Sequence, residues 1–168
     1  MIKDLLERDG KVVGYLTGLS IYNKLGLTTQ VGSVIQIGRQ EVRSPFKRER
    51  YTISFVKQKN TITKDNIPLL QLLDVLRFIK KIPDTKIEES LSTSKQLVAK
   101  LSDQQQETIM RLALKYQPST RALLGAMLTD IGRGEKTERL KNSLNPITAY
   151  AIPGASKVLS SASEWSIR

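Results

Sequence analysis

The sequence predicts an α+β fold, with a β-rich N-terminal third followed by helices. Apolar and polar residues alternate with a period of two at residues 34–37 and 51–56, which is typical of strands. Residues 64–81 would be apolar on most sides of a helix. In the segments after them, apolar residues recur with helical spacing. Because strands and helices occupy separate parts of the chain, this order favours α+β over alternating α/β.

The predicted central helix, residues 64–81, is the element around which the rest should pack. Its few polar positions recur every three or four residues on one narrow stripe: Gln71, Asp74, Arg77 and Lys81. A helix with so little polar surface must be covered on several sides. Thr63 is the expected N-cap, and Pro83 ends the helix because the residue before proline leaves the α region.

Shorter elements are expected before this helix. They are a helix over residues 2–8, a strand over 12–16, a helix capped by Ser20 and ended by Gly26, and strands over 34–37 and 51–56. Asp9-Gly10 is a turn pair between the first two elements. The two longer strands are expected to pair as a hairpin-like unit with a long polar connection.

The C-terminal part is expected to be helical. The predicted helices span 92–101, 102–116, 118–131 and 135–144. Ser102 with Gln105 fits a capping box, and Pro118 suits the first position of a helix. We interpret residues 1–150 as a single domain and 151–168 as a tail, packed on that domain or flexible, with Trp165 as the residue that would fix it.

Composition restricts the classes of function. The formal net charge of +11 and the pI of about 10.0 favour an anionic partner such as nucleic acid, although they also serve solubility. The chain has no cysteine and no histidine, so thiol chemistry and the commonest general base are absent, and we expect no cofactor and no metal site. No apolar run reaches the membrane-spanning length of about 18 residues, which predicts a cytoplasmic protein without a membrane partner.

Basic residues are densest on the predicted strand pair and its connection. Seven face only Glu41 and Glu49: Arg39, Arg43, Lys47, Arg48, Arg50, Lys57 and Lys59. Such a ribbon can follow a phosphate backbone and release counterions from it. The alternative is a solvated basic face that binds nothing.

An enzyme is not expected. The sequence contains neither a glycine-flanked nucleophile elbow nor a Walker-type phosphate loop. Asp84, Glu88 and Glu89 could hold magnesium in principle, as the carboxylates of nucleases do. They follow a helix-ending proline in a polar segment, so an exposed acidic loop is the alternative.

Two motifs resemble a bacterial family of AbiEi-type antitoxins. The first runs from Gly14 to Val31 and includes the segment Gly26-Leu27-Thr28-Thr29-Gln30, and the second runs from Tyr116 to Ala126. The central helix with its Ile82-Pro83 end is also similar. The motif residues that we single out are Thr17, Gly18, Ser20, Gly26, Thr28, Thr29, Gln30 and Arg121.

The resemblance implies a transcriptional regulator of a type IV toxin–antitoxin, phage-defence locus. Such regulators join an N-terminal winged helix, which binds DNA, to an antitoxin domain that counters a nucleotidyltransferase toxin without having to bind it. Fewer than 14 residues precede the first motif, too few for a winged helix, so the chain corresponds to the antitoxin domain. We therefore expect weak, non-specific DNA binding.

Two questions stay open at this point. The Thr17–Val31 motif is either structural or a partner-binding loop that presents Tyr22, Lys24 and Gln30. The whole chain is a non-catalytic nucleic-acid-binding antitoxin domain, or else an interaction domain that forms a homodimer and uses its basic charge for solubility.

Overall fold

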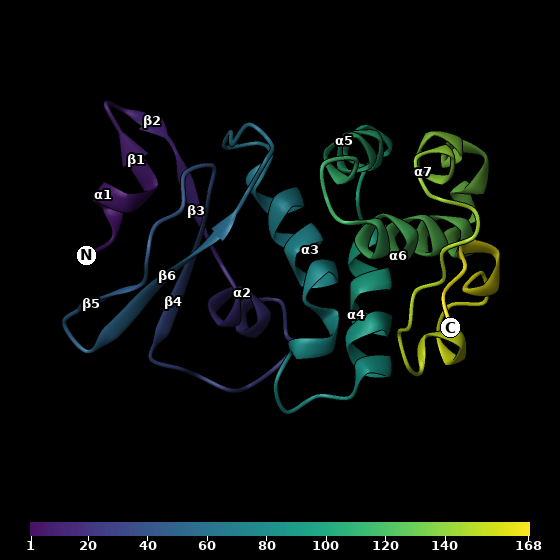
Figure 1. Ribbon diagram of the computed structural model, residues 1–168, viewed down its shortest axis with the longest axis horizontal. Coiled ribbons are helices and arrows are strands. Elements are labelled where there is room, and N and C mark those ends of the chain that lie inside the picture. Colours follow the sequence, from purple (N-terminus) through teal and green to yellow (C-terminus); the bar gives the residue numbers. More distant parts are fainter.

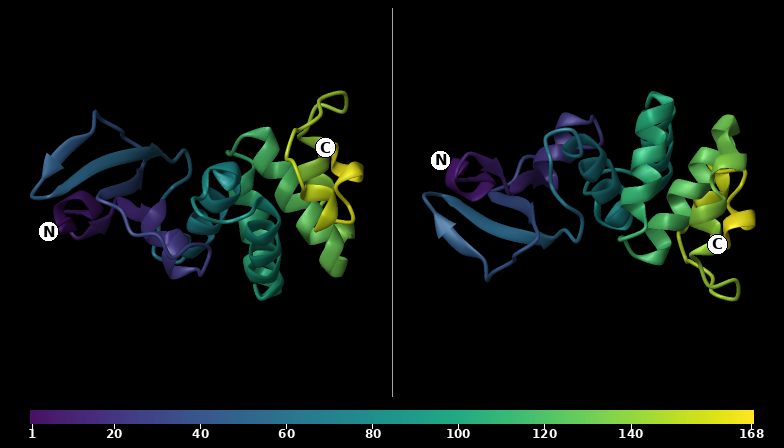
Figure 2. Two further views of the ribbon diagram at one scale, coloured as in Figure 1. Left: turned by 90° about the horizontal axis from the view of Figure 1, so that it is seen from below. Right: turned by 90° about the horizontal axis from the view of Figure 1, so that it is seen from above.

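The computed structural model describes residues 1–168 and has the predicted α+β architecture. The molecule is elongated, with a sheet at one end, helices at the other and helix α3, Ile67–Arg77, between them (Figures 1 and 2). Strands lie in the first third of the chain and most helices follow them. No helix is both long and apolar enough to cross a membrane.

The main sheet has four strands in the order β3-β4-β6-β5. Their bounds are β3 Gly14–Thr17, β4 Val34–Arg39, β5 Phe46–Arg48 and β6 Tyr51–Lys57. Strands β4 and β6 run parallel, so the prediction of a hairpin-like pair is wrong. The connection contains β5, which reverses the chain and pairs antiparallel with β6 through a turn at Glu49, where φ is +55°.

The first thirteen residues cover part of this sheet. Helix α1, Lys3–Leu6, is shorter than expected because β1, Glu7–Arg8, pairs with β2, Lys11–Val12, around the predicted turn. Leu5 of α1 packs against Ile37 and Ile53 in a small apolar cluster. The sheet therefore has its own core on the face opposite α3.

The central helix is confirmed but begins later than predicted. Helix α3 starts at Ile67 because Asn66 takes the N-cap position and Pro68 occupies the first turn. Thr63 accepts a hydrogen bond from the backbone N–H of Asn66 in the preceding turn. The chain continues beyond α3 as a short 3₁₀ helix, Ile79–Lys81. Helix α2, Leu19–Lys24, is also shifted, since Gly18 rather than Ser20 precedes it.

The remaining helices form the other half of the molecule and pack against α3 and against one another. Their bounds are α4 Ile87–Ala99, α5 Asp103–Ala113, α6 Pro118–Leu128 and α7 Glu138–Asn142. The Ser102–Gln105 capping box is present, and Pro118 opens α6 as predicted. A π turn, Thr129–Arg133, and a 3₁₀ turn, Gly134–Lys136, link α6 to α7.

Residues 151–168 pack on the helical half. The tail contains the 3₁₀ turns Ala155–Lys157 and Ser163–Trp165 and returns to form a parallel bridge between Ile167 and Tyr150. The indole of Trp165 is 2% exposed, and its N–H donates to Thr129 Oγ1 at 3.0 Å. The same ring lies on Gly125, where an added Cβ would come within 2.3 Å of it.

We predict that Gly125→Ala lowers the stability of the native state, although alanine favours helices. The new methyl group would overlap the Trp165 ring, and overpacking of this kind costs about 1–3 kcal/mol. Urea unfolding gives the free-energy change. In a Trp165→Ala background the sign should reverse to a gain of about 1 kcal/mol, the helix-propensity difference. The same loss in both backgrounds would show that the ring does not determine the effect.

Candidate nucleic-acid interface

A buried carboxylate joins the two halves of the molecule. Asp74 in α3 has no exposed surface and accepts hydrogen bonds from Tyr15 Oη at 2.7 Å, Thr17 Oγ1 at 2.8 Å and Tyr116 Oη at 2.6 Å. Tyr15 and Thr17 come from β3, and Tyr116 lies between α5 and α6. The Tyr15 ring reaches the carboxylate by lying across Gly38, where an added Cβ would come within 2.3 Å of the ring.

The network continues into the segment after β6. Gln58 Nε2 donates to Tyr15 Oη at 2.9 Å and to Tyr116 Oη at 2.7 Å. Gln58 Oε1 accepts from the backbone N–H and side chain of Asn60, whose Nδ2 donates to the Leu112 carbonyl at 2.9 Å. The end of β6 is thereby held against α5.

Burial governs the protonation of this network. It raises the pKa of the Asp74 carboxyl, and the hydrogen bonds from Tyr116, Tyr15 and Thr17 oppose that rise. Burial, followed by the charge of Asp74, raises the pKa values of Tyr15 and Tyr116, and the same two causes raise that of Tyr22 to about 12. The tyrosines therefore remain hydrogen-bond donors well into the alkaline range.

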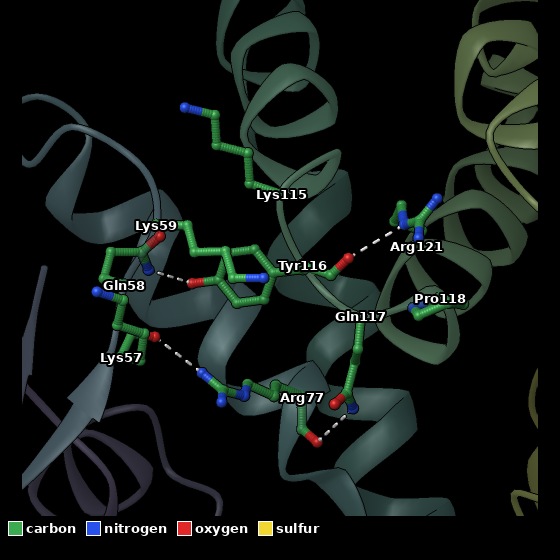
Figure 3. Close-up of a pocket in the computed structure, with 9 residues that line it drawn as sticks. All are labelled: Lys57, Gln58, Lys59, Arg77, Lys115, Tyr116, Gln117, Pro118 and Arg121. Atoms are coloured by element: carbon green, nitrogen blue, oxygen red, sulfur yellow. Dashed lines mark hydrogen bonds between the residues drawn. The ribbon is translucent and has the colours of Figure 1, made fainter.

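A basic hollow opens beside the network, at the junction of sheet and helices. We call it the junction hollow; it has a volume of about 300 Å³ (Figure 3). It is lined by Lys57, Gln58, Lys59, Arg77, Lys115, Tyr116, Gln117, Pro118 and Arg121. Five of these nine residues are cationic and none is acidic, and none of the five belongs to the four ion pairs of the protein.

Hydrogen bonds to the backbone fix three of these cations. Lys57 Nζ donates to the Gln40 carbonyl. Arg77 Nη1 donates to the Lys57 carbonyl at 3.1 Å. Arg121 Nε donates to the Tyr116 carbonyl at 3.1 Å and its Nη1 to Ser143. The N-terminal end of α6 also lies here, at Gln117 and Pro118. Pro118 has no N–H and the Thr120 N–H donates to the Gln117 carbonyl, so the Ser119 N–H is the one left in the first turn for an anion. The hollow thus combines a helix N-terminus with five positive charges, an arrangement suited to phosphate.

The structure distributes the predicted basic cluster over three places. Lys57 and Lys59 line the junction hollow. The β5–β6 hairpin and the loop before it carry Arg43, Lys47, Arg48 and Arg50. Arg39 is buried, with 9% of its surface exposed.

The hairpin arginines are already engaged within the chain. Arg48 forms a two-pronged pair with Asp4, at 2.8 and 3.1 Å, and this bond lowers the pKa of the Asp4 carboxyl. Arg43 stacks on Phe46, with its Cζ 4.6 Å from the ring centroid. Arg50 lies over Tyr51 at 5.1 Å. In the junction hollow, Arg77 likewise stacks on Phe78, at 4.9 Å. Lys59 and Lys115 are the two cations of the hollow whose side chains have no ion pair, hydrogen bond or aromatic contact.

Sequence reasoning missed three cations that line the hollow: Arg77, Lys115 and Arg121. Arg121 was noted only as part of a motif, and the other two sit in stretches with nearly balanced charge. The detectable signal was Asp74, an acid within an otherwise apolar helix, because such a residue requires buried donors from elsewhere.

Most of the residues singled out in the first motif, Gly14–Val31, contribute to the fold itself. Thr17 binds Asp74, and Gly18 and Gly26 have φ values of +70° and +78°. Thr28 Oγ1 donates to the Pro83 carbonyl at 3.0 Å and accepts from the Gln30 N–H. Ser20 and Thr29 are exposed. Tyr22, which only the partner-binding alternative placed on the surface, is 6% exposed and belongs to the core.

The three candidate carboxylates lie away from the hollow. Asp84 is exposed in a turn with φ at +54°, and Glu88 and Glu89 are in the first turn of α4. No group of three or more potential metal-ligating side chains is close enough together to hold a metal ion.

No family model matches the chain, and neither a curated protein nor a solved structure is significantly similar to it.

We predict that stability falls above pH 10 because of the buried tyrosines. Their pKa values are raised in the folded state, so their contribution is fully present below pH 10 and is lost as pH rises further. Each adds a slope of about 1.4 kcal/mol per pH unit. In Tyr116→Phe the free energy of unfolding should therefore fall less steeply with pH, by about 1.4 kcal/mol per pH unit. Urea unfolding between pH 9 and 11.5 measures this slope.

The matched control is Ile109→Val, a core change that removes no titrating group. It should lower the free energy of unfolding by about 0.5–1.5 kcal/mol at every pH, giving a parallel curve. If the free energy of unfolding of Tyr116→Phe also runs parallel to that of wild type, folding does not raise the Tyr116 pKa.

Proposed function

We propose that this chain is a cytoplasmic, non-catalytic nucleic-acid-binding domain of an antitoxin-like regulator, and that the junction hollow is its main phosphate contact. The observation that carries the proposal is the set of five cations that line the hollow, a lining that contains no acidic residue. Unpaired cations next to a helix N-terminus attract a phosphate backbone and release its counterions. The two AbiEi-like motifs support the regulatory context, and the second supplies Tyr116, Gln117 and Arg121 to the hollow.

The expected mode of binding follows from the shape and chemistry of the site. Tyr116 is buried, and the rings of Phe46 and Tyr51 are covered by arginines, so little aromatic surface is free to stack on bases. The hollow is therefore suited to backbone contacts, which carry no sequence information. Binding should be weak and salt-sensitive, with a dissociation constant of about 10⁻⁴–10⁻⁶ M at physiological salt.

Removing two exposed cations from the hollow tests the proposal. We predict that Lys59→Gln with Lys115→Gln weakens binding to random duplex DNA and lowers the slope of log affinity against log salt by about 1.8, the share of two phosphates. Neither side chain takes part in an ion pair, so folding should be retained. Fluorescence anisotropy over a salt series gives both values.

Two matched variants complete the experiment. Lys64→Gln with Lys100→Gln removes the same charge from exposed positions outside the hollow and should leave the slope nearly unchanged. Arg43→Gln with Arg50→Gln removes the same two positive charges from the region of the β5–β6 hairpin. If the hairpin variant loses more affinity than the Lys59/Lys115 variant, the hollow is not the main contact; equal losses in all three would indicate diffuse attraction only.

The second candidate function is an interaction or homodimerisation domain. Its support is a small apolar area beside α2, where Val31 is 85% and Val34 44% exposed next to Leu19. Sedimentation equilibrium distinguishes the two candidates: a dimer that Val31→Ser dissociates, combined with no DNA binding at low salt, would favour the interaction domain. A nucleotidyltransferase gene beside this one would favour the antitoxin context.

A further inference from the structure

Arg39 is a buried cation without an acidic partner. Only 9% of its surface is exposed, and its Nε has no hydrogen-bond partner. It belongs to none of the four ion pairs, and its aromatic contact is with Phe55, at 5.8 Å from Cζ to the ring centroid. Arginine is rarely buried to this extent unless it is paired, because loss of hydration destabilises a lone charge.

Arg39 is one of the residues that line a second hollow, distinct from the junction hollow. This hollow, which we call the Arg39 hollow, has a volume of about 190 Å³ and lies where β4 ends. Its polar lining consists of Arg8, Arg39, Gln40, Glu41 and Thr61, and its apolar lining of Val12, Val13 and Ile62. Gln40 fixes one wall by donating to the Asn60 carbonyl at 2.9 Å.

We propose that the Arg39 hollow is a phosphate-binding site in which Arg39 and Arg8 bind the phosphate oxygens. Guanidinium groups match phosphate geometry and bind it through paired N–H donors. The Thr61 hydroxyl and the Gln40 amide provide neutral polar groups in the same lining. An anion here would give Arg39 the partner that the protein itself does not supply. The site stands on Arg39 alone and does not depend on the proposed function of the junction hollow.

Glu41 is the competing partner inside the chain. It is the one acid of the lining, it is exposed, and it forms no ion pair with either arginine. If Glu41 served Arg39 in solution, removing its charge would destabilise the protein. If phosphate is the partner, removing that charge should tighten phosphate binding, because a competing negative charge is lost.

Thermal melts in sodium phosphate and in sodium chloride of equal ionic strength test the site. A ligand that binds the folded state at ten times its dissociation constant should raise the melting temperature of a protein of this size by about 3–6 °C. Wild type should gain this increment over chloride, Arg39→Met should lose it, and Glu41→Gln should reach it at lower phosphate. Arg50→Met, an exposed arginine outside the Arg39 hollow, is the matched control and should behave as wild type.

Arg8→Met keeps the test decisive if Arg39→Met fails to fold. Arg8 is exposed, so its loss should not disturb the core, and the increment in phosphate should shrink. The Lys59/Lys115 double variant should retain the Arg39-dependent increment, which separates this site from the junction hollow. Equal gains in phosphate for wild type, Arg39→Met and Arg8→Met would overturn the proposal, as would a Glu41→Gln protein that melts lower and gains nothing from phosphate.

Measuring the binding of Arg8→Met to duplex DNA identifies the source of the phosphate group. If the hollow binds a nucleic-acid backbone, Arg8→Met should weaken duplex binding and lower its salt slope by about 0.9, the share of one phosphate. If it binds a free phosphate or a small phosphorylated molecule, duplex binding by Arg8→Met should equal that of wild type while its thermal increment in phosphate is still smaller.

Discussion

The buried carboxylate of Asp74 constrains the arrangement of the whole molecule. A carboxylate on an otherwise apolar helix can be buried only when donors surround it, and here they come from β3 and from the turn between α5 and α6. The sheet, α3 and the later helices must therefore meet at one point. Gln58 and Asn60 extend this requirement to the end of β6, because they bridge the two tyrosines and the Leu112 carbonyl.

This constraint also explains why cations far apart in the sequence become neighbours. Gln58 is tied to Tyr116, so Lys57 and Lys59 on one side must lie near Lys115 and Gln117 on the other. Solvent screening makes their mutual repulsion tolerable in the free protein. A bound phosphate would offset that repulsion, so the basic hollow at this junction points to an anionic ligand.

Local sequence signals predicted much of the fold, whereas the site depended on long-range pairing. The capping box at Ser102, Pro118 at the start of α6 and the apolar helix before Pro83 are each specified within a few residues. The parallel pairing of β4 with β6 is not, because a polar connection gave no sign that β5 would reverse the chain. The hollow was missed for a related reason. Lys115 and Arg77 line the same hollow only because Tyr116, far along the chain, hydrogen-bonds to Asp74.

A titration of the ¹⁵N-labelled protein with a short DNA duplex tests the central claim most directly, namely that the junction held by Asp74 forms the anion-binding surface. The account predicts that the largest amide chemical-shift changes occur at residues 57–59 and 115–121 together, and that they disappear as salt is raised. Changes confined to the β5–β6 hairpin, or no changes at low salt, would contradict it.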